Sequence, residues 1–88
     1  MCLVAIMRYV LYHATWCPFC RAFAPKFRSL LPEGDEVLLD DESDPRWIEL
    51  NIPFVPTIIA YDGEKEAGRL QAVPHVGITD DMFRDFLK

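Results

Sequence analysis

The sequence predicts an α/β fold with four strands and three helices in the order β-α-β-α-β-β-α. Apolar runs rich in strand-forming residues alternate along the chain with segments whose apolar residues recur at helical spacing. An Asp-Gly pair also separates two strand-like runs in the second half, which is typical of a β-hairpin. Because 88 residues enclose only one small core, we expect residues 1–88 to form a single domain.

Residues 3–13, which read LVAIMRYVLYH, are expected to form the first strand, since they make a long apolar run rich in strand formers. This run does not resemble a signal peptide or a membrane span. No basic residue precedes it, Arg8 interrupts it, and it is shorter than the roughly 20 residues that a span requires. We therefore expect no membrane association and a cytoplasmic location, where stable disulfides are rare.

The first helix is expected to begin at Cys17 and to bury one face. The apolar residues of that face are Cys20, Phe23, Ala24, Phe27, Leu30 and Leu31. Pro25 lies inside the segment and removes one backbone hydrogen bond, so we expect a kink there. A short buried strand is expected next, at residues 36–40 (EVLLD).

Residues 43–50 predict a short helix with Asp44 at the N-cap and Pro45 at the first helical position. Asn51 is expected to end this helix. Trp47 in the helix and Phe54 after it are expected to lie in the core.

A β-hairpin is expected to follow, with strands in residues 54–61 and 64–70 joined by Asp62-Gly63. The last segment, residues 79–87, predicts a helix capped by Thr79. Two aspartates in its first turn suit the positive end of the helix dipole.

Charge narrows the classes of partner. The formal net charge is -5 at pH 7 and no Lys/Arg-rich run offsets it, so we expect no nucleic-acid partner. The acidic run at residues 40–44 (DDESD) is too irregular for a calcium loop and is expected to be solvated. We expect a monomer that carries no metal and no cofactor.

The segment WCPFC, residues 16–20, holds two of the three cysteines. A structural zinc site usually needs four ligands, whereas here Cys2 is distant and the two histidines, His13 and His75, are far apart in sequence. A disulfide that closes so short a loop adds little stability. The pattern therefore favours a redox centre.

A redox role has a physical basis in the position of Cys17 at the expected start of a helix. As an N-cap, its sulfur is placed to accept hydrogen bonds from the amides of Phe19 and Cys20. These amides and the helix dipole stabilise a thiolate more than a thiol. Cys20 lies one turn further on the apolar face, so we expect it to stay protonated and to act as the resolving thiol.

The segment HATWCPFCRAFAP, residues 13–25, resembles the active-site segment of thioredoxins. Trp16, Cys17, Cys20, Arg21 and Pro25 occupy the matching positions. Val55, Pro56 and Thr57 match the hydrophobic residue, cis-proline and threonine that lie beside that active site. The resemblance extends through the hairpin and the closing helix, and it implies the minimal thioredoxin fold, a four-stranded mixed sheet flanked by three helices.

Several positions depart from the thioredoxin pattern. Full-length thioredoxins carry an extra strand and helix before this point, whereas only 16 residues precede Cys17 here, so we expect the minimal four-stranded fold. Pro18-Phe19 is close to the glutaredoxin Pro-Tyr. Val55 and a single Gly68 stand where glutaredoxins usually have a threonine and a glycine pair for glutathione. Leu11 stands where thioredoxins bury an aspartate that helps to deprotonate the resolving thiol.

The resemblance implies a thiol-disulfide oxidoreductase in cell redox homeostasis that reduces protein disulfides. Cys17 attacks the substrate and Cys20 resolves the mixed disulfide, and the resulting disulfide is reduced by a thioredoxin reductase or a small-thiol donor. Trp16, Pro18, Phe19, Val55 and Pro56 are expected to bind the substrate. Two alternatives stay open: a glutaredoxin that uses glutathione or another small thiol, and a non-catalytic binding module or metal-handling protein.

Two further residues are candidates for tuning the Cys17 thiolate. His13 lies four residues before Cys17, and Arg21 lies one helical turn after it. The alternative is that His13 is an ordinary strand residue and Arg21 a solvated one. Cys2 is expected to be an inert thiol and His75 a loop residue.

Overall fold

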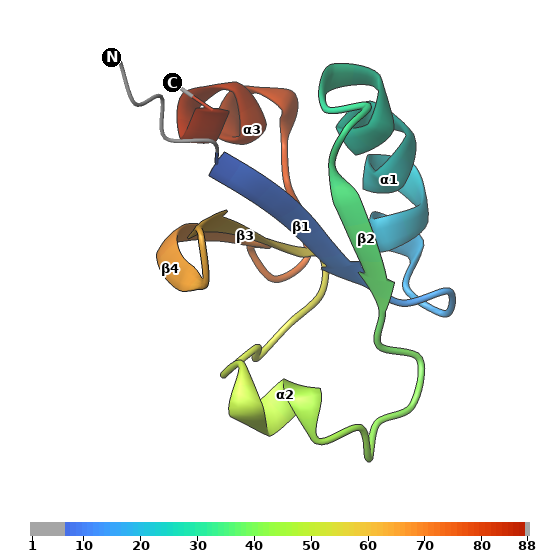
Figure 1. The fold of residues 1–88 in the computed structure, drawn as a ribbon. Helices are drawn as coiled ribbons and strands as arrows, with labels where there is room; N and C mark the ends of the chain where they lie inside the picture. Colours follow the sequence, from blue (N-terminus) through green and yellow to red (C-terminus); the bar gives the residue numbers. More distant parts are fainter. Residues whose placement is uncertain (1–6, 88) are drawn as a thin grey trace.

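The computed structural model describes residues 7–87 and contains the expected order of elements (Figure 1). They are β1 (Met7–His13), α1 (Pro18–Leu30), β2 (Asp35–Leu38), α2 (Arg46–Glu49), β3 (Thr57–Asp62), β4 (Lys65–Gln71) and α3 (Asp80–Leu87). The part of the first expected strand before residue 7 lies outside the described residues, and so does Cys2. None of the helices within residues 7–87 is long and apolar enough to cross a membrane.

The four strands form one sheet in the order β2-β1-β3-β4. Strand β1 is parallel to β2 and antiparallel to β3, and β3 and β4 form the expected hairpin, so the sheet is mixed as predicted. At the end of β1, Tyr12 pairs with Thr57 at the start of β3. This pairing brings the segment before α1 and the segment before β3 to the same end of the sheet (Figure 1).

The sheet is covered on both faces. Leu11 of β1 belongs to the larger core cluster, which joins the sheet to α1 and α3 through Phe23, Phe27 and Phe83. Its neighbours Val10 and Tyr12 point to the opposite face, because side chains alternate along a strand. There they pack with Leu39, Ile52 and Ile59, together with the partly buried Trp47 of α2 and Leu50, which directly follows this helix.

Helix α1 buries the face that its sequence predicts, with Cys20, Phe23, Ala24 and Phe27 inside and Pro25 accommodated within the helix. The expectation for Leu30 is wrong, because this side chain is 49 % exposed. The helix ends at this residue, and Leu31 is the one that turns back against the core.

The prediction that the second strand is buried is also wrong. Among the described residues 7–87, strand β2 lies at the edge of the sheet and pairs with β1 alone, so its side chains are covered less than those of the central strands. Leu38 is 47 % exposed, whereas Leu39, directly after the strand, is fully buried.

Helix α2 begins one residue later than expected, with Pro45 at the N-cap position. Asp44 still serves the helix start, because its Oδ1 accepts the backbone N–H of Arg46 at 2.9 Å. Asn51 ends the helix as predicted, in the left-handed region with φ of 53°.

The hairpin turn is also shifted by one residue. Asp62 still pairs with Lys65, so the two turn residues are Gly63 and Glu64. Gly63 has φ of 66°, a conformation that glycine adopts without steric cost. The cap of α3 is as predicted, since Thr79 Oγ1 accepts the Met82 N–H at 3.2 Å.

Candidate active site

Cys17 lies between the end of β1 and the start of α1, where it caps the helix. Its backbone is extended, and its sulfur accepts the Cys20 N–H at 3.3 Å. The second expected bond, from the Phe19 amide, is absent within residues 7–87. Pro18 occupies the first turn of the helix as predicted and is exposed. Cys17 itself keeps 6 % exposure.

Cys20 is fully buried and faces the same small cluster as Cys17, with Ala14 and Val55. Burial, together with the hydrogen bond to Cys17, raises the pKa of the Cys20 thiol to about 12. Both cysteines are free thiols. The raised pKa favours the protonated thiol at Cys20, and Cys17 is the less buried of the two sulfurs.

The segment before β3 completes the surroundings of Cys17. The bond between Val55 and Pro56 is cis, as the thioredoxin resemblance implies. The Cys17 thiol donates to the Val55 carbonyl oxygen at 3.6 Å, and Pro56 is buried beneath it. Thr57 Oγ1 donates to the Phe54 carbonyl at 2.7 Å and ties this segment together.

Trp16 stands beside Cys17 with 52 % of its surface exposed. Its indole Nε1 donates to the Asp40 carbonyl at 2.9 Å, and its ring stacks on Trp47 at 6.5 Å between centroids. Asp40 is an exposed loop residue, as expected, and its carboxylate also accepts the Thr15 N–H at 2.7 Å and the Thr15 hydroxyl at 3.0 Å. No local sequence signal pairs these segments, because they meet only through the β1–β2 register.

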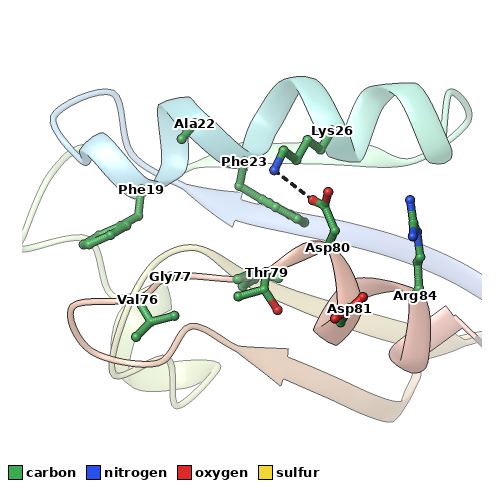
Figure 2. A pocket seen from close by; sticks show the side chains of 11 residues that line it. Phe19, Ala22, Phe23, Lys26, Val76, Gly77, Thr79, Asp80, Asp81 and Arg84 are labelled. Atoms are coloured by element: carbon green, nitrogen blue, oxygen red, sulfur yellow. Dashed lines mark ion pairs between the residues drawn. The ribbon is translucent and has the colours of Figure 1, made fainter.

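Phe19 separates two hollows near Cys17 and is 40 % exposed. One hollow, of about 240 Å³, also contacts Phe54 and Val55; the other, of about 560 Å³, lies between α1 and α3 (Figure 2). Phe19 packs onto Gly77, where an added Cβ would come within 2.9 Å of its Cδ1.

Away from Phe19 in the larger hollow, Lys26 of α1 reaches Asp80 of α3 at 2.8 Å (Figure 2). Phe54 lines the smaller hollow and is 48 % exposed, so its expected place in the core is wrong. The reason is that Phe54 belongs to the surface loop that leads to the cis bond. His75 is an exposed loop residue on the same hollow, as expected.

His13 is 8 % exposed and lies at the end of β1, where its Nε2 is 3.2 Å from Glu36 Oε1. Burial lowers the pKa of His13, and the Glu36 carboxylate opposes this shift. Arg28 holds the same carboxylate with bonds of 2.7 and 2.8 Å, which lower the pKa of Glu36. The contact of His13 is thus with Glu36 rather than with a cysteine sulfur.

Arg21, the other tuning candidate, is exposed on α1. Its backbone N–H donates to the Cys17 carbonyl at 3.1 Å, and its side chain lines a hollow of about 250 Å³ together with His13 and Arg28. Within residues 7–87, no three histidine, cysteine or acidic side chains gather in a way that would hold a metal ion.

Comparison with known proteins identifies the relatives of this chain. The sequence model of the thioredoxin family matches residues 5–83. No curated protein sequence matches the chain. Among solved structures, thioredoxin f from spinach chloroplast (long form) has a TM-score of 0.76 at 22% identity, over 94% of this chain and 69% of that one.

Two further structures have the same fold. Thioredoxin from Fasciola hepatica has a TM-score of 0.71 at 23% identity, over 94% of this chain and 79% of that one. A chain in the complex of ferredoxin:thioredoxin reductase with thioredoxin f2 has a TM-score of 0.74 at 17% identity, over 94% of this chain and 76% of that one. At these identities the structural likeness establishes the fold.

Proposed function

Because this chain belongs to the thioredoxin family, we propose that it is a thiol-disulfide oxidoreductase that reduces protein disulfides through a Cys17/Cys20 relay. The observation that carries the proposal is the difference between the two thiols. Cys17 caps α1 and keeps a little exposure, whereas Cys20 is fully buried and has a raised pKa. In this proposal Cys17 attacks the substrate disulfide, and Cys20 reacts afterwards with the mixed disulfide.

The reaction transfers two electrons in two exchange steps. The Cys17 thiolate attacks one sulfur of the substrate disulfide, forms a mixed disulfide, and releases the other substrate sulfur as a thiolate that takes up a proton. Cys20 then loses its proton and attacks the Cys17 sulfur. The second substrate thiol leaves, and a Cys17–Cys20 disulfide remains.

Substrate contacts in this proposal come from the surface around Cys17. Trp16 and Phe19 are exposed aromatic side chains on the two sides of the cysteine, and Val55 presents backbone beside its sulfur. Extended substrate backbone has room to pair with Val55, which is a form of strand addition. Pro18 is exposed at the start of α1, and Pro56 holds the cis bond that follows Val55.

The electron donor that we propose is a thioredoxin reductase. A thioredoxin f2 crystallises with ferredoxin:thioredoxin reductase, and the chain in that structure has the present fold. The dipeptide Pro18-Phe19 keeps a small thiol such as glutathione as the alternative donor. We further propose a monomer that works in a reducing compartment, the cytoplasm, where both cysteines persist as thiols.

The deciding experiment is reduction of insulin disulfides with a thioredoxin reductase, in parallel with a glutathione-coupled assay. We expect activity with the reductase, and activity with glutathione alone would assign the chain to the alternative. Inactivity in both assays would leave a binding module.

The order of attack has its own test. Cys20→Ser should accumulate mixed disulfides with substrate through Cys17, whereas Cys17→Ser should trap almost none. Equal trapping by both variants, measured on non-reducing gels, would contradict the relay.

A further inference from the structure

The Trp16 indole is held from two sides although half of it faces solvent. Nε1 donates to the Asp40 carbonyl at 2.9 Å, and the ring stacks on Trp47 with an interplanar angle of 21°. An exposed side chain of this size would otherwise sample several rotamers. The two contacts fix the direction of the indole, and 52 % of the residue stays exposed to solvent.

Trp47 is itself fixed by the fold. It packs against the core cluster on its face of the sheet, and its Nε1 donates to the Asp41 carbonyl at 3.0 Å. The two indoles therefore bind successive carbonyls of one short segment, Asp40 and Asp41. Helix α2 lies beyond the end of the sheet where β1 and β2 finish (Figure 1), which is also the end at which the chain leads from β1 to Cys17.

A second tie makes this connection independent of the aromatic contact. Thr15 donates its N–H and its hydroxyl to the Asp40 carboxylate at 2.7 and 3.0 Å. These hydrogen bonds hold the backbone before Cys17 against the segment after β2. The contact with Trp47 therefore restrains only the Trp16 side chain. Removing Trp47 should free the indole without releasing the backbone.

We propose, on the basis of the function proposed above, that Trp47 is a positioning residue: it holds Trp16 in the orientation in which protein disulfide substrates dock beside Cys17. An aromatic anchor that is ordered before docking loses little rotamer freedom on binding, and such anchors dominate binding energies. A small disulfide meets the Cys17 sulfur without covering Trp16. Trp47 therefore raises the preference for protein disulfides over small ones.

The test measures this preference directly. The reduced protein, in excess, is mixed with insulin or with the small disulfide bis(2-hydroxyethyl) disulfide, and the reaction is quenched with acid. The second-order rate constants for the two disulfides are then compared. The variants are Trp47→Leu, which keeps apolar packing without the ring, and Trp47→Phe, which keeps a ring for stacking. Leu50→Ala is the matched control, because Leu50 packs on the same core cluster through α2.

We expect Trp47→Leu to slow insulin reduction by roughly three- to tenfold, the range that loss of an aromatic pair produces. Its rate with the small disulfide should stay near that of the wild type, and Trp47→Phe should restore much of the insulin rate. Leu50→Ala should lower stability and leave the ratio of the two rates unchanged. Equal slowing with both disulfides in Trp47→Leu, or no slowing with either, would overturn the proposal.

A spectroscopic measurement separates positioning from packing. The indole N–H of Trp16 should exchange with solvent several-fold faster in Trp47→Leu than in the wild type or in Leu50→Ala, as followed by NMR. An unchanged exchange rate would overturn the proposal even if the insulin rate fell. If the wild type reduces neither disulfide, the proposed function fails instead, and the exchange measurement still decides whether Trp47 orders Trp16.

Discussion

Cys20 is fully buried, whereas Cys17 keeps 6 % exposure. The pKa of Cys20 is raised to about 12, mainly because burial disfavours the charged thiolate. We predict that iodoacetamide labels Cys17 of the reduced protein before Cys20 at pH 7, since alkylation requires an accessible thiolate. Peptide mass mapping over time measures the order. In denaturant the two cysteines should react at similar rates, and earlier labelling of Cys20 in the folded protein would contradict the assigned roles.

Leu11 stands where thioredoxins bury the aspartate that helps to deprotonate the resolving thiol, so Cys20 lacks that base. Leu11 is fully buried among Phe23, Phe27 and other apolar side chains, so no carboxylate occupies the position where thioredoxins place one. Glu36, which pairs with Leu11 across the strands, is engaged by Arg28 and His13. If no base assists the Cys20 thiol, the rate at which it resolves the mixed disulfide should rise with pH over about 7–9.

We predict that Leu11→Asp accelerates resolution near pH 7 and lowers the melting temperature, because burying an unpaired carboxylate is costly. Leu11→Asn is the matched control, which carries the polarity without the base and should lower stability without acceleration. Stopped-flow kinetics and thermal unfolding measure the two effects. A wild-type rate that is already flat between pH 7 and 9 would point to another base, with His13→Ala the first variant to examine.

At the level of elements, the sequence predicted what is encoded within a few residues. The caps at Thr79 and Asn51 and the buried face of α1 depend on local spacing, and the structure confirms them, except for Leu30 at the end of that helix. The exposure of Leu38 and of Phe54 depends on which strand lies at the edge and how a loop crosses the surface. Such features follow from contacts between distant segments, which local patterns do not record.

The loop before α3 offers a prediction at this scale, because Gly77 is constrained twice. Its φ is 80°, and an added Cβ would come within 2.9 Å of Phe19 Cδ1. Gly63 has φ of 66° with nothing within 4 Å, so it is a control for backbone strain alone.

Both Gly77→Ala and Gly63→Ala should lose about 1 kcal/mol of unfolding free energy from strain. Only Gly77→Ala should also displace Phe19 and slow insulin reduction. Chemical denaturation and the insulin assay measure the two effects. Equal activity of both variants would show that Phe19 does not contribute to substrate contact.

On the scale of the whole molecule, the candidate site is assembled from segments that the sheet order brings together. The cysteines, the cis-proline and the exposed tryptophan were recognisable in the sequence because a family pattern marks them. Trp47, Asp40 and the group formed by His13, Glu36 and Arg28 were not, because each depends on pairing between β1 and its neighbours. These contacts link the region of α1, β1, β2 and α2 into one connected unit.

Buried and paired titratable groups make the stability of this unit depend on pH at both ends. The pKa of His13 is lowered in the folded state, so its contribution is present above its unfolded value of 6.5 and is lost as pH falls through the folded value. The lowered pKa of Glu36 adds a second loss below its unfolded value of 4.5. We predict that the unfolding free energy, from urea titrations, falls from about pH 6.5 downward. His13→Gln should flatten the first part of this fall and leave the part below pH 4.5; an unchanged acid limb would contradict the assignment.

At alkaline pH the dependence has the opposite sign: the unfolding free energy falls as pH rises. The pKa of Cys20 is raised from 9.0 to about 12, so its contribution to stability is complete below the unfolded value and is lost as pH rises toward the folded one. The pKa of Tyr12 is raised too, by burial and by its hydrogen bond with Tyr61, and it acts in the same direction.

The reduced protein should therefore lose unfolding free energy above pH 9, and Cys20→Ala should make that loss less steep, whatever its effect on stability at neutral pH. Oxidation to the Cys17–Cys20 disulfide removes the same titrating thiol, so oxidised wild type and reduced Cys20→Ala should show equally shallow alkaline limbs. A limb as steep in these two forms as in the reduced wild type would mean that Tyr12, rather than Cys20, governs stability at high pH.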